Sequence, residues 1–211
     1  MTSTYLMLSA PSEYPKVRAI TFVGHGSGGI VLQRYAVLRQ KSDPRGIKMR
    51  YVIGDPSTML YFTEDRPSPV SNDNCDIYNL FFYGLEQYEI PYSKAEDPSD
   101  LFKVYASRDV RYMIGLEDTS PTNGDESCGA KAQGGVQRKD RSLVYWKYIH
   151  LLAGESVDNY QQFPGDFNSL RNAAPSEFQT NLHHQLFAIS DVGHDMNAVF
   201  SSDQGLHAIF S

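Results

Sequence analysis

The stretch VRAITFVGHGSGGIVLQRYAVLRQ at residues 17–40 decides the fold prediction. Residues 17–24 form a β-rich apolar run that stops at glycine, which predicts a buried strand. Residues 30–40 repeat apolar side chains with the period of a helix, and this pattern places Arg34 and Arg39 on the outward face. The glycine-rich turn HGSGG lies between the two segments. The sequence therefore predicts a strand, a tight turn and a helix in direct succession.

Three further apolar runs predict buried strands of the same kind, at residues 49–54, 110–115 and 185–190. The other helices are expected at residues 99–108, 141–152 and 196–200. Buried strands that alternate with helices are typical of a parallel sheet in an α/β fold. We expect a single domain over residues 1–211, with about four mostly parallel strands and flanking helices.

The stretch 55–97 interrupts this alternation. It contains the turn-rich segments DPS, DRPSP, SNDN and IPY together with many tyrosines, and it shows no lasting period. Loops of this length in a compact domain are usually functional or unusual. We predict a long structured excursion over the domain.

The predicted strands end at Gly24, Gly54, Gly115 and Ser190. Residues that can carry chemistry follow each end, in the segments GHGSGG, DPS, LEDT and DVGHD. In parallel sheets the ligand lies beyond the carboxyl ends of the strands. We therefore expect the functional site at this edge of the sheet.

The composition excludes several classes of function. A formal net charge of −6 argues against binding to nucleic acid or to an anionic membrane surface. The longest apolar runs are five or six residues, too short for a transmembrane helix. The first 17 residues place no basic residue ahead of a short apolar patch, which argues against a signal peptide and leaves the localisation open.

The two cysteines, Cys75 and Cys128, are 53 residues apart and form no CxxC pair. This spacing gives no metal site, and no cofactor is predicted either. Two free thiols are expected in a cytosolic protein and one disulfide in a secreted protein. Composition leaves both possibilities open.

The turn GHGSGG permits a first interpretation as the dinucleotide-binding pattern G-x-G-x-x-G. Gly24, Gly26 and Gly29 would then place a pyrophosphate on the helix N-terminus. Asp55 would hold a ribose hydroxyl, although it follows Gly29 by 26 residues, which is longer than the usual spacing. The protein would then be a Rossmann-like domain.

The second interpretation is a nucleophile elbow, G-x-S-x-G, which needs serine at its apex. Gly24 and Gly28 occupy the flanking positions, but the apex residue is Gly26. Ser27 follows one residue later. It is expected either to cap the helix N-terminus or to serve as a displaced nucleophile.

His194 lies in DVGHD, between a strand and a helix, where a loop histidine can reach a nucleophile as general base. Asp118 follows the third strand and could orient that histidine. Glu117 and Asp125 are competing carboxylates, and a surface histidine with solvated acids is the alternative. The predicted catalytic residues are Ser27, Asp118 and His194.

These segments together resemble a family of α/β-hydrolases found in fungi and other microbes. Its members have an elbow similar to GHSAGG followed by QRYA, which this chain has at 33–36. The order nucleophile, acid, histidine is also that of α/β-hydrolases. The other similar segments are DPSTMLYFTEDRP (55–67), Cys75, YGL (83–85), PY (91–92), RDVRYMIGLEDT (108–119), DESCGAKAQG (125–134) and DVGHDMNAVFSSDQG (191–205).

The resemblance implies an ester hydrolase that acts on a small ester-like substrate, with Asp118 as the triad acid and His194 as the base. It implies a disulfide between Cys75 and Cys128, as in secreted members. The family serine falls on Gly26. We therefore expect a protein of carboxylic ester hydrolase ancestry that is catalytically impaired or inactive, with a non-catalytic binding module as a further alternative.

A complete member of the resembled family has about four strands before the elbow strand, and a loop among them donates one oxyanion N–H. Only 16 residues precede the elbow strand here, so we expect a partial α/β-hydrolase fold truncated at its N-terminus. The elbow strand would then expose unpaired N–H and C=O groups along a hydrophobic edge. Such an edge predicts a homo-oligomer.

Overall fold

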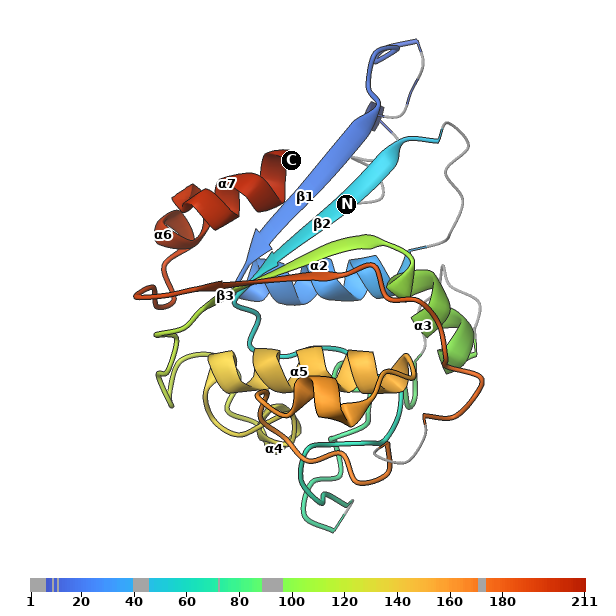
Figure 1. Cartoon of the computed structure of the whole chain (residues 1–211), viewed down its shortest axis with the longest axis vertical. Coiled ribbons are helices and arrows are strands. Elements are labelled where there is room, and N and C mark those ends of the chain that lie inside the picture. The colour runs from blue at the N-terminus through green and yellow to red at the C-terminus, as the bar shows by residue number, and fades with distance from the viewer. Residues whose placement is uncertain are drawn as a thin grey trace.

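A parallel β-sheet runs through the middle of the molecule, with helices on both of its faces (Figure 1). This computed structural model describes residues 7, 8, 10, 12–39, 46–71, 73–88, 97–170 and 174–211. The strands found in these residues are β1 (Ala19–His25), β2 (Lys48–Gly54), β3 (Asp109–Gly115) and β4 (Gln185–Ile189). They lie in the order β1-β2-β3-β4, and every neighbouring pair is parallel, which confirms the predicted α/β fold.

The register of the sheet brings the four carboxyl ends together. His25 lies opposite Gly54, Gly54 opposite Met113, and Met113 opposite Phe187. The loops that follow the strands therefore leave the sheet at one edge, which positions the site described below.

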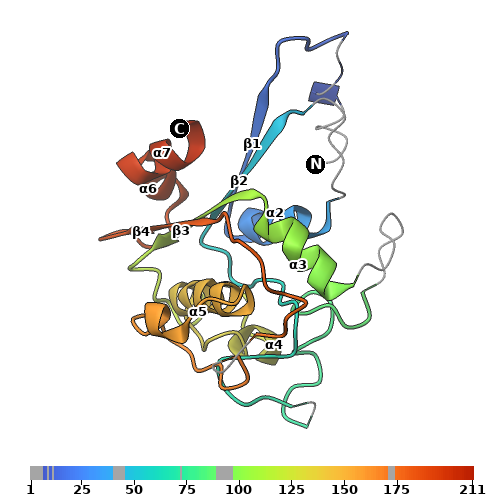
Figure 2. The same ribbon diagram turned by 45° about the vertical axis from the view of Figure 1, so that its right-hand side comes forward.

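Helices of two groups cover the two faces of the sheet (Figures 1 and 2). One face carries α2 (Ser27–Leu38), α3 (Pro98–Ala106) and α5 (Arg138–Leu152). The other face carries α6 (Met196–Ser201) and α7 (Asp203–Phe210). A short helix α4 (Cys128–Lys131) and a 3-10 helix η1 (Val157–Tyr160) complete the described elements. None of the helices among the described residues is long and apolar enough to cross a membrane.

The alternation of side chains along the strands produces two separate cores. On β2, Tyr51 and Ile53 point into the larger core under α2, α3 and α5. Val52, between them, points to the opposite face and packs with Val199 of α6 and Ala208 of α7. The strands are buried on both faces, which explains why they are continuous apolar runs in the sequence.

The excursion after β2 does not simply lie over the domain as predicted. Residues 55–62 are all buried and run through the larger core. Their backbone groups are satisfied by side chains, because a buried loop must pair its N–H and C=O groups. Gln133 bonds both N–H and C=O of Met59, at 2.8 and 2.7 Å, and Tyr145 donates to the carbonyl of Leu60 at 3.0 Å. Pro91 and Tyr92 lie outside the described residues.

Arg34 is a second correction, because the helical pattern places it outward and the structure buries it to 5% exposure. Its guanidinium donates to the carbonyls of Thr58 and Phe82, both at 2.6 Å, and so fastens the excursion to α2. Val31, expected in the apolar stripe of the helix, is instead 51% exposed. The buried face of α2 is therefore rotated from the predicted one, since the incoming loop rather than the helix period selects it.

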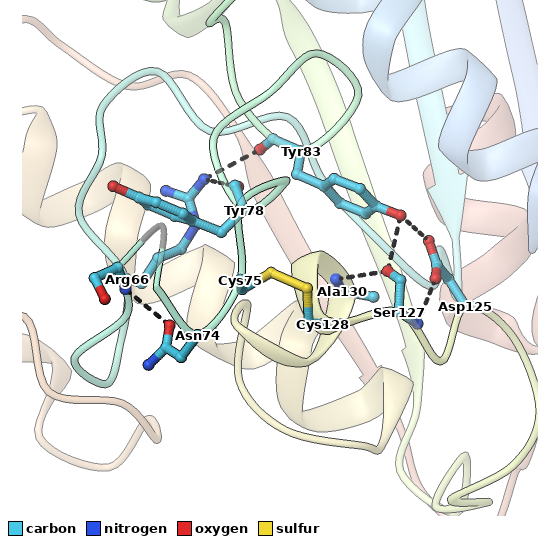
Figure 3. Close-up of a disulfide and its surroundings, with 10 residues drawn as sticks. Arg66, Asn74, Cys75, Tyr78, Tyr83, Asp125, Ser127, Cys128 and Ala130 are labelled. Carbon is cyan, nitrogen blue, oxygen red and sulfur yellow. Dashed lines mark hydrogen bonds between the residues drawn. A yellow bond between two sulfur atoms is a disulfide. The ribbon is translucent and has the colours of Figure 1, made fainter.

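A disulfide joins Cys75 in the excursion to Cys128 at the start of α4 (Figure 3). Of the two possibilities that composition left open, the structure has the disulfide. Beside it, the hydroxyl of Tyr83 bonds Asp125 at 2.6 Å and Ser127 at 2.8 Å. The disulfide and these bonds attach the far part of the excursion to the loop after β3.

Candidate active site

The turn between β1 and α2 is built from glycines because the strand and the helix approach closely there. A Cβ on Gly24 would lie 2.5 Å from the carbonyl oxygen of Gly28, and one on Gly29 would lie 2.8 Å from that of Gly54. Gly26, at the apex, has φ +54° and ψ −119°, a backbone conformation that side chains with a Cβ rarely adopt. The local geometry is a sharp turn from strand to helix.

The apex of this turn faces His194, which lies in the loop between β4 and α6. A Cβ placed on Gly26 would lie 3.0 Å from Nε2 of His194 and 3.3 Å from its Cε1. The imidazole is 31% exposed and its Nε2 atom points at the apex. The structure thus brings two segments together that are 168 positions apart in the sequence.

Asp118 lies on the other side of the His194 ring. Its Oδ2 atom is 3.0 Å from Nδ1 of His194, and the residue is only 2% exposed. An imidazole bonded in this way to a carboxylate carries its proton on Nδ1 and leaves Nε2 free to accept. The hydrogen bond therefore orients the basic nitrogen of His194 toward Gly26.

Arg138, the first residue of α5, also binds Asp118. Its Nε donates to Oδ2 at 2.8 Å and its NH2 group to Oδ1 at 2.6 Å, and Arg138 itself is 3% exposed. A buried carboxylate needs such a partner, because an uncompensated buried charge costs several kcal/mol. Nothing in the sequence pattern singled out Arg138, which lies 20 residues beyond Asp118.

The competing carboxylates do not reach the histidine. Asp125 accepts from the Tyr83 hydroxyl and from the backbone N–H of Ser127 beside the disulfide. Glu117 is exposed. Of the three candidates, Asp118 is the carboxylate in contact with His194.

Ser27 takes no part in the hydrogen bonds of this arrangement among the described residues. It is exposed and lines a shallow apolar depression beside β1, together with Val23, Gly28 and Val31. No hydrogen bond joins it to His194 among the described residues. The prediction that Ser27 caps α2 is wrong, because the N-cap is Gly26 and Ser27 is already the first helical residue.

Two residues that the sequence did not combine complete the site. Nε2 of His25, at the end of β1, is 3.2 Å from Oδ2 of Asp55, directly after β2, and the His25 and His194 rings lie 4.4 Å apart. Asp55 is 1% exposed, adopts a positive φ of 41°, and accepts the N–H of Gly115 on Oδ1 at 2.9 Å. The one sequence feature that could have predicted this pair is that each residue directly follows a predicted strand.

Comparison with solved structures identifies proteins that share the fold of this chain. No protein-family model and no curated protein matches the sequence. Poly(aspartic acid) hydrolase-1 from Sphingomonas sp. KT-1 superposes with a TM-score of 0.62 and 16% identity over 98% of this chain and 61% of its own. LpqC, a poly(3-hydroxybutyrate) depolymerase from Bordetella parapertussis, gives a TM-score of 0.58 and 15% identity over 92% of this chain and 51% of its own.

The fold is that of these hydrolases. The chain spans 61% and 51% of the lengths of the two enzymes, and at such low identity the likeness shows the fold and not the activity. The dinucleotide-binding interpretation is not favoured. Both carboxylate oxygens of Asp55, assigned there to a ribose, are engaged by Gly115 and His25.

Proposed function

We propose that this protein is an α/β-hydrolase of carboxylic ester hydrolase ancestry whose nucleophile position is occupied by Gly26, so that it is catalytically impaired. One observation carries the proposal. A side chain begun at Gly26 would meet Nε2 of His194, whose Nδ1 is held by the buried Asp118. This is the arrangement in which a base takes the proton of a nucleophile and an acid orients the base.

Each residue has a definite role in this proposal. A hydroxyl on residue 26 would attack the ester carbonyl of the substrate and give its proton to Nε2 of His194. Asp118 would stabilise the imidazolium that forms. Arg138 holds Asp118 in place, as a positioning residue behind the acid. The chain has the base and the acid in contact, and glycine supplies no nucleophile to them.

The substrate class follows from the ancestry. The two similar structures are named for hydrolysis of poly(aspartic acid) and poly(3-hydroxybutyrate). We propose a small ester-like molecule as the substrate of any remaining activity. In the chain as it stands, attack would have to come from Ser27, which does not bond His194 and would need the turn to rearrange.

The test is restoration of the missing nucleophile. The Gly26→Ser variant should hydrolyse p-nitrophenyl acetate at least about 100-fold faster than the wild type, because loss of a serine nucleophile costs about 10⁶-fold in a known serine protease. Poly(3-hydroxybutyrate) serves as a second substrate. The double variant G26S/H194A should return to the wild-type rate.

Two controls decide between the outcomes. The new hydroxyl should be trapped by a phosphonylating serine reagent in Gly26→Ser, and intact-mass spectrometry should place the adduct on residue 26. If wild-type protein already turns over ester with a rate lost in both S27A and H194A, the chain uses Ser27 and is not impaired in the way proposed. If G26S is folded but neither labelled nor active, the elbow interpretation is wrong.

A further inference from the structure

Three side chains with metal-ligand atoms lie close together at this edge of the sheet, and only one of them belongs to the proposed triad. These atoms are Nε2 of His25, a carboxylate oxygen of Asp55 and Nε2 of His194, and one donor atom from each lies within 4.8 Å of the others. They come from the ends of β1, β2 and β4, which the parallel register brings side by side. Two imidazoles and one carboxylate form a ligand set used by zinc and other divalent transition metals.

We propose that His25, Asp55 and His194 bind a divalent transition-metal ion, with Zn²⁺ as the best fit. This proposal goes beyond the proposed function and does not depend on it. It also departs from the sequence prediction of no metal site, which was drawn from the cysteine spacing. Ligands contributed by three separate loops leave no spacing signature in the sequence.

The distances suit a metal. Ligand atoms at about 2.0–2.1 Å from a tetrahedral zinc ion lie about 3.3 Å from one another. Nε2 of His25 and Oδ2 of Asp55 are already 3.2 Å apart. The donor atom of His194 lies within 4.8 Å of the other two, and its side chain, 31% exposed, is the member of the set open to solvent.

The groups behind two of the ligands hold them by hydrogen bonds, as the groups behind metal ligands do. Asp118 bonds Nδ1 of His194 at 3.0 Å, which leaves the lone pair of Nε2 free to accept, and the His25 ring lies 4.4 Å from the His194 ring. The N–H of Gly115 binds Oδ1 of Asp55 and leaves Oδ2 directed at His25. Both partner bonds orient the donor that the ion would use.

Glycine at position 26 makes room for the ion. In a serine hydrolase Nε2 of the histidine is bonded to the serine hydroxyl. Here no side chain stands between the apex and Nε2 of His194, so this nitrogen is free to coordinate. Coordination by Nε2 of His25 would place the ring proton on Nδ1, without net loss of a proton from the neutral imidazole, and three protein ligands leave a further position open for water.

The experiment uses the untagged chain of residues 1–211, stripped with a chelator and returned to chelator-free buffer. Titration calorimetry should show one Zn²⁺ bound per chain. His25→Ala and His194→Ala should each weaken the affinity at least about 100-fold, because loss of a residue that only hydrogen-bonds to a metal ligand already costs about 10–100-fold. Asp55→Asn, which keeps an acceptor for the Gly115 N–H, should also weaken it. His183→Ala, an exposed histidine at the opposite end of the sheet, is the matched control and should bind as the wild type does.

A second measurement needs no ligand variant. Nitrogen-detected NMR of the wild type should show that one equivalent of Zn²⁺ shifts two of the six histidine rings. Gly26→Ala should weaken binding at least tenfold, since its Cβ enters the space before Nε2 of His194 while all three ligands remain. Absence of stoichiometric Zn²⁺ binding, or binding retained in folded H25A and H194A, would overturn the site. Neither result affects ester hydrolysis by G26S, measured with chelator present, so the two proposals fail separately.

Discussion

At the scale of single residues, burial rather than sequence neighbourhood determines what a charged or polar side chain does. His184 illustrates this, because it lies just before β4 and is 8% exposed. Its Nε2–H donates to the carbonyl of Tyr105 at 2.9 Å, and its Nδ1 atom is buried without a hydrogen-bond partner among the described residues. A protonated ring would leave a charged Nδ1–H without water, so burial lowers the pKa of His184 from 6.5 to about 3.

This lowered pKa predicts a pH dependence of stability. Below pH 6.5 the unfolded chain takes up a proton on His184 that the folded chain refuses until about pH 3. Above pH 6.5 His184 is neutral in both states and does not lower the free energy of unfolding. As the pH falls from 6.5 toward 3, His184 lowers the free energy of unfolding by up to about 1.4 kcal/mol per pH unit. Urea unfolding measured across this range should have a smaller slope with pH in His184→Gln than in the wild type. The exposed neighbour variant His183→Gln should keep the wild-type slope, and equal slopes in all three proteins would contradict the prediction.

At the scale of elements, the β1–turn–α2 unit depends on glycines whose roles differ although they are adjacent. Gly28 and Gly29 are the second and third residues of α2. A Cβ on Gly29 would meet the carbonyl oxygens of Gly54 and Gly24 at 2.8 and 3.3 Å, whereas a Cβ on Gly28 would meet nothing within 4 Å. The first contact is with strand backbone, which cannot move aside as a side chain can.

These two positions form a matched pair of substitutions. Gly29→Ala should lower the free energy of unfolding by about 1–3 kcal/mol, because it overpacks the helix against β1 and β2. Gly28→Ala should leave it unchanged or raise it by up to about 1 kcal/mol, since alanine favours helix over glycine. Denaturant titration of the two variants checks both. If Gly29→Ala proves as stable as Gly28→Ala, the close approach of helix and strand is not a constraint on the fold.

At the scale of the whole molecule, β1 forms one edge of the sheet, and β2 is its only strand neighbour among the described residues. The apolar depression beside it includes Val23, 44% exposed, and Val31, 51% exposed. An edge strand with exposed apolar side chains offers unpaired backbone groups to another strand. We propose that a second copy of this chain covers this edge.

Sedimentation velocity over a range of protein concentrations tests this association. The wild type should form dimers or larger species as the concentration rises, and the double variant V23K/V31K should remain monomeric because lysine blocks edge pairing. Val136→Lys, at a residue 41% exposed in the segment before α5, is the control and should associate like the wild type. A wild type that stays monomeric at every concentration excludes the proposal.

The sequence predicted the four strands to within two residues at each end, because strands buried on both faces are continuous apolar runs. It also named Asp118 and His194, which the structure joins by a hydrogen bond, while their catalytic roles stay predictions. Helix α7 was not predicted as a separate element, since its short apolar pattern follows α6 after one residue.

The sequence by itself determined the strand–turn–helix unit and the edge of the sheet at which chemistry-bearing residues gather, because both follow from local periodicity and from parallel connection. Only the tertiary structure decided that Arg34 is buried, that residues 55–62 enter the core, and that His25 faces Asp55. Each of these depends on a segment at least 24 residues away that supplies the burial or the hydrogen-bond partner. Neighbouring residues in the sequence give no information on such long-range contacts. These contacts bring residues of separate loops together in one site.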